Sequence, residues 1–87
     1  MTTTTTNPTT FVALCPNYWG KGATVDEAKN NLKAAGGNLT KYVVFRLPDG
    51  ATNVGVSPVN GAIDWEWAEG ADTTKTMEVV AKRGVNL

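Results

Sequence analysis

The sequence contains no histidine and only one cysteine, Cys15. Without histidine, a Ser-His-Asp triad and the usual Cys/His zinc sites are excluded. A cysteine nucleophile would also lack the imidazole base that normally generates its thiolate. A single cysteine cannot form an intramolecular disulfide, which is typical of proteins from a reducing compartment. Because Cys15 ends the apolar run Phe11–Cys15, we expect a buried, inert thiol.

An excess of charge of either sign is also missing, because eight Lys and Arg residues balance eight Asp and Glu residues. A free-standing nucleic-acid binder usually carries a basic excess, since phosphate neutralisation drives its affinity. The signs are nevertheless unevenly placed: residues 1–47 sum to +3 and residues 48–87 to −3. This asymmetry would let copies associate head to tail, although a solvated surface of mixed sign is the simpler interpretation.

Long apolar runs are absent, and no segment approaches the roughly 20 residues of a membrane helix. The N-terminus has no basic region followed by an apolar stretch, so we expect no secretory signal. We therefore expect a cytoplasmic protein with no membrane partner. No cofactor motif is present, so we expect no cofactor and no resident metal.

The 87 residues suffice for one small domain. The first ten contain seven threonines and no charged side chain. We predict a disordered threonine-rich tail over residues 1–9, a single α+β domain over 10–84 and a frayed end over 85–87. A domain of this size has little room for a catalytic pocket.

The clearest local signal is a capping box at Thr24 and Glu27, in which the Thr24 hydroxyl accepts from the Glu27 amide. Gly36-Gly37 supplies a left-handed stop, so a helix of about three turns is predicted between these signals. The apolar residues at helical spacing within it are Val25, Ala28, Leu32 and Ala35.

The other patterns predict strands, bounded by turn signals such as Pro48-Asp49-Gly50 and Asn60-Gly61. The predicted strands are 11–15, 41–47, 52–56, 62–68 and 75–82. The fold class is therefore α+β, with one helix on one face of a four- to five-stranded, mostly antiparallel sheet, in the order β-α-β-β-β-β. If the first two strands are parallel, the helix makes a right-handed crossover.

Alternation within two strands assigns their faces. Ile63, Trp65 and Trp67 share one face of 62–68, and we expect them to form the core beneath the helix. An exposed aromatic platform is the alternative. In 75–82 the corresponding apolar set is Met77, Val79 and Ala81.

Residues 16–23 are interpreted as a loop that precedes the helix. The glycines and the lysine in it make an anion site at Lys21, Gly22, Ala23 and Thr24 one interpretation, since helix N-termini bind phosphate. The complete phosphate-loop pattern is absent. The alternative is a tight connection in which Tyr18 and Trp19 plug the edge of the core.

The acidic residues after Ile63 have several interpretations. Asp64 and Glu66 form a carboxylate pair on one strand face, and with Asp72 they could hold a divalent cation. A solvated face that discourages aggregation is the ordinary interpretation. We place a candidate interaction surface on the aromatic loop and this acidic region; its residues are Tyr18, Trp19, Lys21, Asp64, Glu66, Glu69 and Asp72.

The segment from Tyr18 to Ala28, with Leu32, Gly36-Gly37 and the strand Tyr42–Arg46, resembles small uncharacterised bacteriophage proteins over about residues 11–65. The resemblance implies a phage origin and expression in the cytoplasm of a bacterial host cell. Residues 22–30 are more faintly similar to the helix start of HicB-type antitoxins. The strand pair and Gly-Cys that this family places before the helix are not matched here.

These observations support three functional hypotheses. The first is a small, non-enzymatic accessory protein that binds a protein partner, including a host factor. The second is a nucleic-acid or nucleotide-binding module, whose cations should converge on one surface; they are Lys21, Lys29, Lys33, Lys41 and Arg46. The third is a self-assembling structural component, and thus a homo-oligomer.

Overall fold

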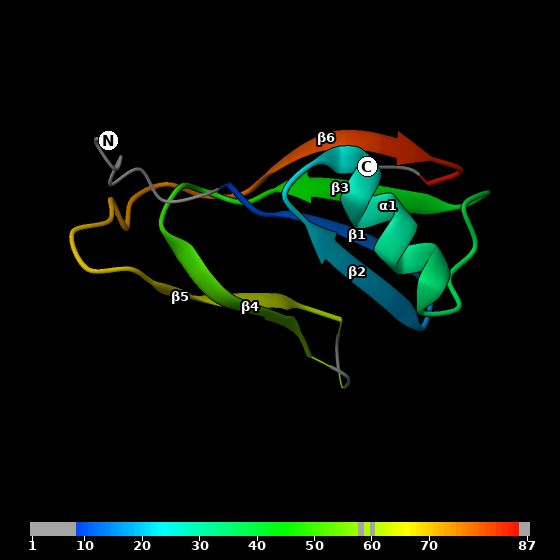
Figure 1. The fold of residues 1–87 in the computed structure, drawn as a ribbon, viewed down its shortest axis with the longest axis horizontal. Helices are drawn as coiled ribbons and strands as arrows, with labels where there is room; N and C mark the ends of the chain where they lie inside the picture. The colour runs from blue at the N-terminus through cyan, green and yellow to red at the C-terminus, as the bar shows by residue number, and fades with distance from the viewer. Residues whose placement is uncertain (1–8, 58, 60, 86–87) are drawn as a thin grey trace, which may run out of the picture.

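The computed structural model describes residues 9–57, 59 and 61–85, and within them it contains one helix and six strands (Figure 1). The elements are β1 (Phe11–Cys15), β2 (Tyr18–Gly22), α1 (Val25–Ala34), β3 (Tyr42–Arg46), β4 (Ala51–Val56), β5 (Ile63–Trp67) and β6 (Glu78–Arg83). Four strands form an antiparallel sheet in the order β2-β1-β3-β6, and β4 pairs with β5 in a separate hairpin. The predicted α+β class, with a helix packed on a sheet, is confirmed.

The structure describes few of the terminal residues on which the predicted domain boundaries depend. Residues 1–8 of the predicted tail, and residues 86–87 of the predicted frayed end, lie outside the described residues. Thr9 is described, and its hydroxyl donates a hydrogen bond of 2.8 Å to the Asp49 carboxylate. The boundaries therefore stay a prediction.

The interpretation of residues 16–23 as a loop is wrong, because β2 occupies Tyr18–Gly22. A two-residue turn at Pro16-Asn17 joins it to β1, and Asn17 has a φ of 73° in the left-handed region that asparagine tolerates. Gly20 and Gly22 lower the strand propensity of this segment, so the sequence pattern did not indicate a strand. The element order is thus β-β-α-β-β-β-β, with the helix joining β2 to β3 and β1 lying antiparallel between them.

The helix begins and ends where the sequence predicts. The Thr24 hydroxyl accepts a hydrogen bond of 3.0 Å from the Glu27 amide. At the other end Gly36 has a φ of 110°, and the amides of Gly36 and Gly37 donate to the carbonyls of Lys33 and Leu32. This is the Schellman arrangement that satisfies the last carbonyls of a helix.

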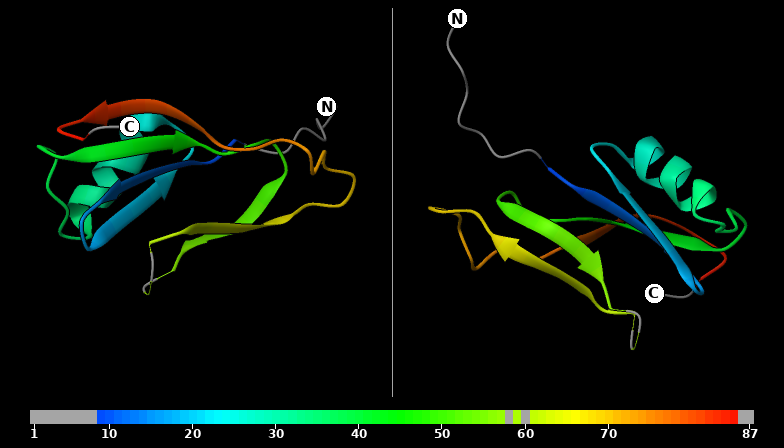
Figure 2. Two further views of the ribbon diagram at one scale, coloured as in Figure 1. Left: turned by 180° about the vertical axis from the view of Figure 1, so that it is seen from behind. Right: turned by 60° about the horizontal axis from the view of Figure 1, so that its bottom comes forward.

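The sheet buries apolar side chains on both faces, and Figure 2 shows α1 on one side of it and the β4–β5 hairpin on the other. We call the first cluster the helix-side core; its buried residues are Ala13, Ala28, Leu32, Tyr42 and Val44. We call the second the hairpin-side core; its buried residues are Val12, Leu47, Ala51, Val54 and Ile63. The neighbours Val12 and Ala13 in β1 thus serve opposite cores, as alternation along a strand requires.

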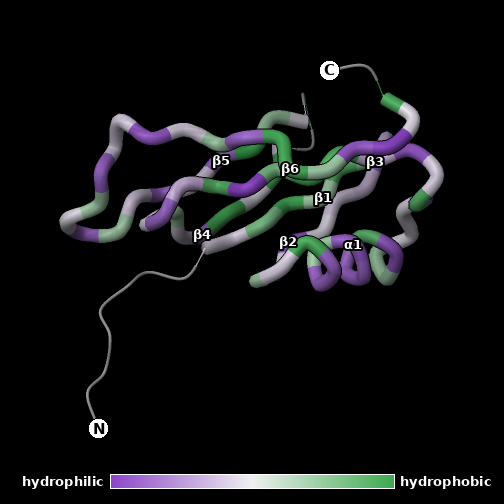
Figure 3. Tube along the Cα trace, turned by 90° about the horizontal axis from the view of Figure 1, so that it is seen from above, coloured by the Kyte–Doolittle hydropathy of each residue, from purple (hydrophilic) through white to green (hydrophobic). Residues whose placement is uncertain are grey.

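The hydropathy of the trace agrees with this layering. Figure 3 shows a largely hydrophilic helix, while the hydrophobic stretches lie in the strands that the layers enclose. Cys15 is half-buried rather than buried, because it ends β1 next to the exposed turn at Pro16.

The tryptophans of β5 do not lie beneath the helix, so that expectation is wrong. The helix packs on β1, β2 and β3, whereas Trp65 packs against the hairpin-side core. The alternation itself is correct, since Trp65 and Trp67 share a face and meet edge to face with ring centroids 5.8 Å apart. Both indoles are half-buried, so they are neither a sealed core nor a free platform.

The predicted common face of Met77, Val79 and Ala81 is also wrong. Met77 packs against the hairpin-side core and Ala81 against the helix-side core. The cause is a β-bulge: Val44 pairs with Ala81 and Phe45 with Val79, which leaves Val80 as the extra residue. One extra residue moves every later side chain to the other face of the sheet.

Candidate functional site

Strand β2 presents different chemistry on its two faces. Tyr18, Gly20 and Gly22 face the helix, because they pair with Cys15, Ala13 and Phe11 of β1. A Cβ on Gly20 would clash with the backbone of Leu32, and one on Gly22 would lie 2.7 Å from the Glu27 side chain. The glycines therefore allow the helix backbone to approach the sheet closely.

The opposite face of β2 holds the β4–β5 hairpin. Trp19 packs against the hairpin-side core, and the Lys21 ammonium donates a hydrogen bond of 3.2 Å to the Val54 carbonyl in β4. Tyr18 and Trp19, predicted as a pair, consequently point to opposite faces of the sheet. Tyr18 instead lies beside Gly36 at the end of the helix.

Three of the four residues of the candidate anion site, Lys21, Gly22 and Ala23, line one hollow together with Glu27, and Thr24 does not line it. Lys21 extends to the hairpin side, whereas Gly22 lies under Glu27 on the helix side. The Glu27 amide is already bonded to the Thr24 hydroxyl. Asp26 and Glu27 supply negative charge in the first turn, where an anion would sit. No ligand-binding result bears on this site, so it stays a prediction.

An open cleft of about 530 Å³ lies between the β1–β2 turn and the tip of the β4–β5 hairpin. We call it the hairpin cleft. Its apolar walls come from Leu14 and Trp19 on the sheet and from Val56 and Val59 on the hairpin. Val59, exposed to 92%, stands at the cleft with large apolar surface in solvent, whereas the ring of Tyr18 lies beside Gly36 on the helix face. An arrangement of this kind is suited to contact with another apolar surface.

The acidic residues of the candidate interaction surface do not line this cleft. Asp64 and Glu66 occupy the face of β5 opposite Ile63, beside a shallow hollow shared with Asn53 and Trp65. The Asn53 amide donates to the Glu66 carboxylate over 2.8 Å, so this acid is tied to the β4 bulge. Glu69 follows β5 and is exposed. The seven predicted residues are thus spread over separate surfaces.

Asp72 lies in the connection between β5 and β6. The side-chain hydroxyl of Thr74 and then its backbone amide donate to Asp72, and these bonds lower the pKa of the Asp72 carboxyl. Asp72 lines a polar hollow together with Arg46, Asp49 and Lys75. This hollow does not include Asp64 or Glu66, so the predicted trio for a divalent cation is not assembled. Among the described residues, no three side chains of the types Asp, Glu and Cys lie close enough together to hold a metal ion.

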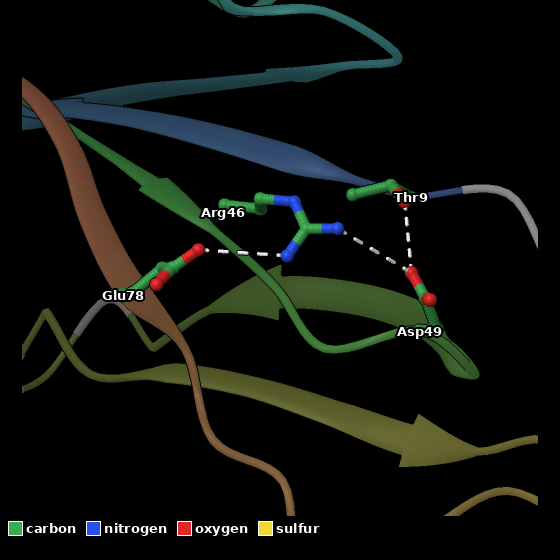
Figure 4. Close-up of polar contacts among 4 residues, drawn as sticks. All are labelled: Thr9, Arg46, Asp49 and Glu78. Atoms are coloured by element: carbon green, nitrogen blue, oxygen red, sulfur yellow. Dashed lines mark hydrogen bonds and ion pairs between the residues drawn. The ribbon is translucent and has the colours of Figure 1, made fainter.

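Arg46 lies between two carboxylates. Its guanidinium lies 4.0 Å from the Asp49 carboxylate and 3.5 Å from the Glu78 carboxylate (Figure 4). Thr9 donates to the same Asp49 oxygen, so these contacts connect the start of β1, the end of β3 and β6. Both ion pairs are exposed and contribute little to stability.

The remaining predicted cations gather at the opposite end of β3. The Lys29 ammonium lies 5.1 Å from the centroid of the Tyr42 ring, and Lys33 follows one helical turn later. Lys41 precedes Tyr42, and Arg83 is the β6 partner of Tyr42. Lys29 and Arg83 therefore lie beside Tyr42, with Lys33 one helical turn away and Lys41 next to Tyr42 in the chain. The sequence interpretation omitted Arg83. Lys21 and Arg46 lie elsewhere.

Sequence reasoning missed the hairpin half of the cleft. In the sequence, Val56 only ends the predicted strand 52–56, and Val59 only precedes the turn signal Asn60-Gly61. The only signal that could have found Val59 is that it is a large apolar residue beside an otherwise polar turn.

The helix that the structure describes is not long and apolar enough to span a membrane.

Comparisons of this chain with protein-family models, with curated proteins and with solved structures found no match.

Proposed function

We propose that this chain is a small, non-enzymatic accessory protein of phage type that acts in the bacterial cytoplasm by binding a protein partner, including a host factor. The observation that carries the proposal is the hairpin cleft. It combines the half-buried indole of Trp19 with the exposed apolar side chain of Val59. Aromatic anchors in such recesses dominate the energetics of many protein interfaces.

The construction of the cleft supports a partner that inserts apolar side chains. One wall is the β1–β2 end of the sheet, and the other is the hairpin that Lys21 and Trp19 hold in place. We thereby narrow the candidate surface to Trp19, Val56 and Val59.

A photo-cross-linking residue at position 59 provides a direct test, because Val59 is 92% exposed and its replacement leaves the core intact. In a bacterial lysate we expect one cross-linked protein, displaced by excess wild-type chain but not by a Val59→Lys chain. A cross-linker at Thr73, an exposed position in the β5–β6 connection, is the matched control and should not capture it. Equal competition by the Val59→Lys chain would contradict the proposal.

Nucleic-acid binding is the second candidate function, favoured by the cations around Tyr42. Phosphate contacts by Lys29, Lys33, Lys41 and Arg83 would make binding to duplex DNA weaken steeply with salt. Lys29→Glu combined with Lys33→Glu should abolish this binding, whereas Lys75→Glu, in the β5–β6 connection, should leave it unchanged. If wild-type protein does not retard DNA at low salt, this candidate is removed.

A further inference from the structure

We propose that the open edge of β2 receives an extended segment of the protein partner as an added antiparallel strand, with one uncharged apolar side chain in the hairpin cleft. The inference rests on the proposed function, because it states the conformation and the chemistry of the partner at the same cleft. Within the described residues, β2 lies at an edge of the four-stranded sheet and pairs only with β1 (Figure 1). Exposed sheet edges commonly bind a peptide as an additional strand.

The hydrogen-bond pattern of β1 shows which backbone groups of β2 face the open edge. The Leu47 amide donates to the Thr10 carbonyl over 2.9 Å, so Thr10 and every second residue after it bond to β3. The residues between them, Ala13 among them, bond to the residues opposite them in β2. Trp19 and Lys21 alternate with those bonded residues of β2, so their amides and carbonyls point away from β1.

Asn31 in α1 provides an independent check of this orientation. Its side-chain amide donates to the Lys21 carbonyl, which agrees with a carbonyl that points to the open edge. Asn31 thereby occupies one of the four outward groups. Within the described residues the other three have no hydrogen-bond partner; they are the Trp19 amide, the Trp19 carbonyl and the Lys21 amide. Two donors and one acceptor are therefore available to extend the ladder by a short strand.

Two apolar features lie at this edge on opposite faces of the sheet. Trp19 faces the hairpin cleft, where Val56 and Val59 form the opposite wall. Tyr18 is 44% exposed, and its ring lies beside Gly36 on the helix face. Successive side chains of a strand point to opposite faces, so one extended segment at this edge reaches both features. A helix placed in the cleft would reach only the face of Trp19, which is why we infer a strand.

Antiparallel pairing fixes the register of the added segment, because one of its residues exchanges both hydrogen bonds with Trp19. We call this residue of the partner the cleft residue. Its side chain lies on the same face as Trp19 and enters the hairpin cleft. The residue after it lies opposite Tyr18 and packs against that ring on the other face. The residue two positions before it directs its carbonyl to the Lys21 amide.

The walls of the cleft determine the chemistry of the cleft residue. None of the described residues that line the cleft is charged, and Leu14, Trp19, Val56 and Val59 supply its apolar surface. A charged side chain would lose water there without gaining a partner, so an apolar side chain is favoured. Proline is excluded, since it has no amide to donate to the Trp19 carbonyl.

A yeast-displayed library of heptapeptides tests the inference, with leucine fixed at peptide position 4 and the other positions randomised. We expect the wild-type chain to enrich peptides with an apolar residue at peptide position 5, which lies opposite Tyr18. Val59→Lys should weaken binding of an enriched peptide at least about tenfold, because an ammonium replaces an apolar wall of the cleft. Thr73→Lys, at an exposed position of the β5–β6 connection, is the matched control and should bind the peptide as the wild type does. Thermal melts of both variants establish that they fold.

Backbone methylation distinguishes an added strand from an apolar side chain that binds alone. Methylation of the leucine amide in the synthetic peptide removes the donor to the Trp19 carbonyl and should weaken binding at least about tenfold. Methylation of the amide at peptide position 5, which points away from β2, is the matched control and should change the affinity by less than about twofold.

Three results would overturn the inference. The first is that the wild-type chain enriches no peptide. The second is equal binding of the enriched peptide by Val59→Lys and Thr73→Lys. The third is an equal loss of affinity on methylation at peptide positions 4 and 5. If the cross-linker at position 59 still captures its protein in these cases, the proposed function stands and only the extended conformation of the partner is rejected.

Discussion

At the scale of single residues, the structure depends on a few side chains with specific local partners. The Thr24 hydroxyl satisfies a helix amide, and the Lys21 ammonium connects β2 to the Val54 carbonyl. Lys21 illustrates how the same residue type supports different interpretations. In the sequence it stands between glycines before a helix, which is typical of anion sites, but in the structure it holds the hairpin.

Thr24→Ala should lower the free energy of unfolding by about 1 kcal/mol, because the Glu27 amide loses its hydrogen-bond acceptor. Chemical denaturation followed by circular dichroism measures this change. Thr24→Ser keeps the hydroxyl and should remain close to wild type. Equal stability of the alanine variant and the wild type would show that the cap does not hold this helix terminus.

At the scale of secondary-structure elements, the decisive contact is that of α1 with β2. Gly20 lies directly under the backbone of Leu32, so the helix is closer to the sheet than any side chain would permit. Strand β2 can therefore be understood only together with the helix. Its glycines reduce strand propensity in isolation and favour the packed arrangement.

Gly20→Ala should destabilise the protein by about 1–3 kcal/mol, because its methyl group would overlap the backbone of Leu32 and displace the helix. Gly55→Ala is the matched control, since a Cβ at that β4 position meets no atom within 4 Å. Thermal unfolding of the two variants side by side gives the comparison. Equal melting temperatures would contradict the close approach.

Elements with strong local signals could be predicted from the sequence, and those defined by tertiary contact could not. The capping residue Thr24 and the exit at Gly36 located the helix, and alternation located β5. The sequence could not reveal β2, whose glycines matter only beneath a helix, or the bulge at Val80, which depends on pairing with β3. The candidate site was only half predictable for the same reason: Trp19 was identified, but its opposing wall at Val59 comes from a distant hairpin.

At the scale of the whole molecule, the helix and the β4–β5 hairpin pack on opposite faces of one sheet, but they are attached to it differently. The helix is anchored by close backbone contact, whereas the hairpin is held by the hairpin-side core and the Lys21 hydrogen bond. A two-stranded hairpin is at best marginally stable by itself. The hairpin should therefore open more readily than the rest of the fold.

Native-state hydrogen exchange should show this difference, with lower opening free energies for amides of β4 and β5 than for those of β1 and β3. Ile63→Ala removes a buried side chain of the hairpin-side core and should widen the gap. The control is Leu32→Ala, in the helix-side core, which should lower protection throughout. Uniform protection across all six strands would mean that the hairpin and the sheet open as one unit.

The route of the chain between β3 and β6 has an engineering consequence. These two strands are neighbours in the sheet, yet residues 47–77 make a long excursion before returning to it. A short turn grafted in place of the excursion would keep the strand order of the four-stranded sheet, but it would expose Val12 on the face that the hairpin covers. Because the excursion also carries Val56 and Val59, the apolar wall opposite Trp19, a designed change of binding surface must supply another hairpin that covers the same face.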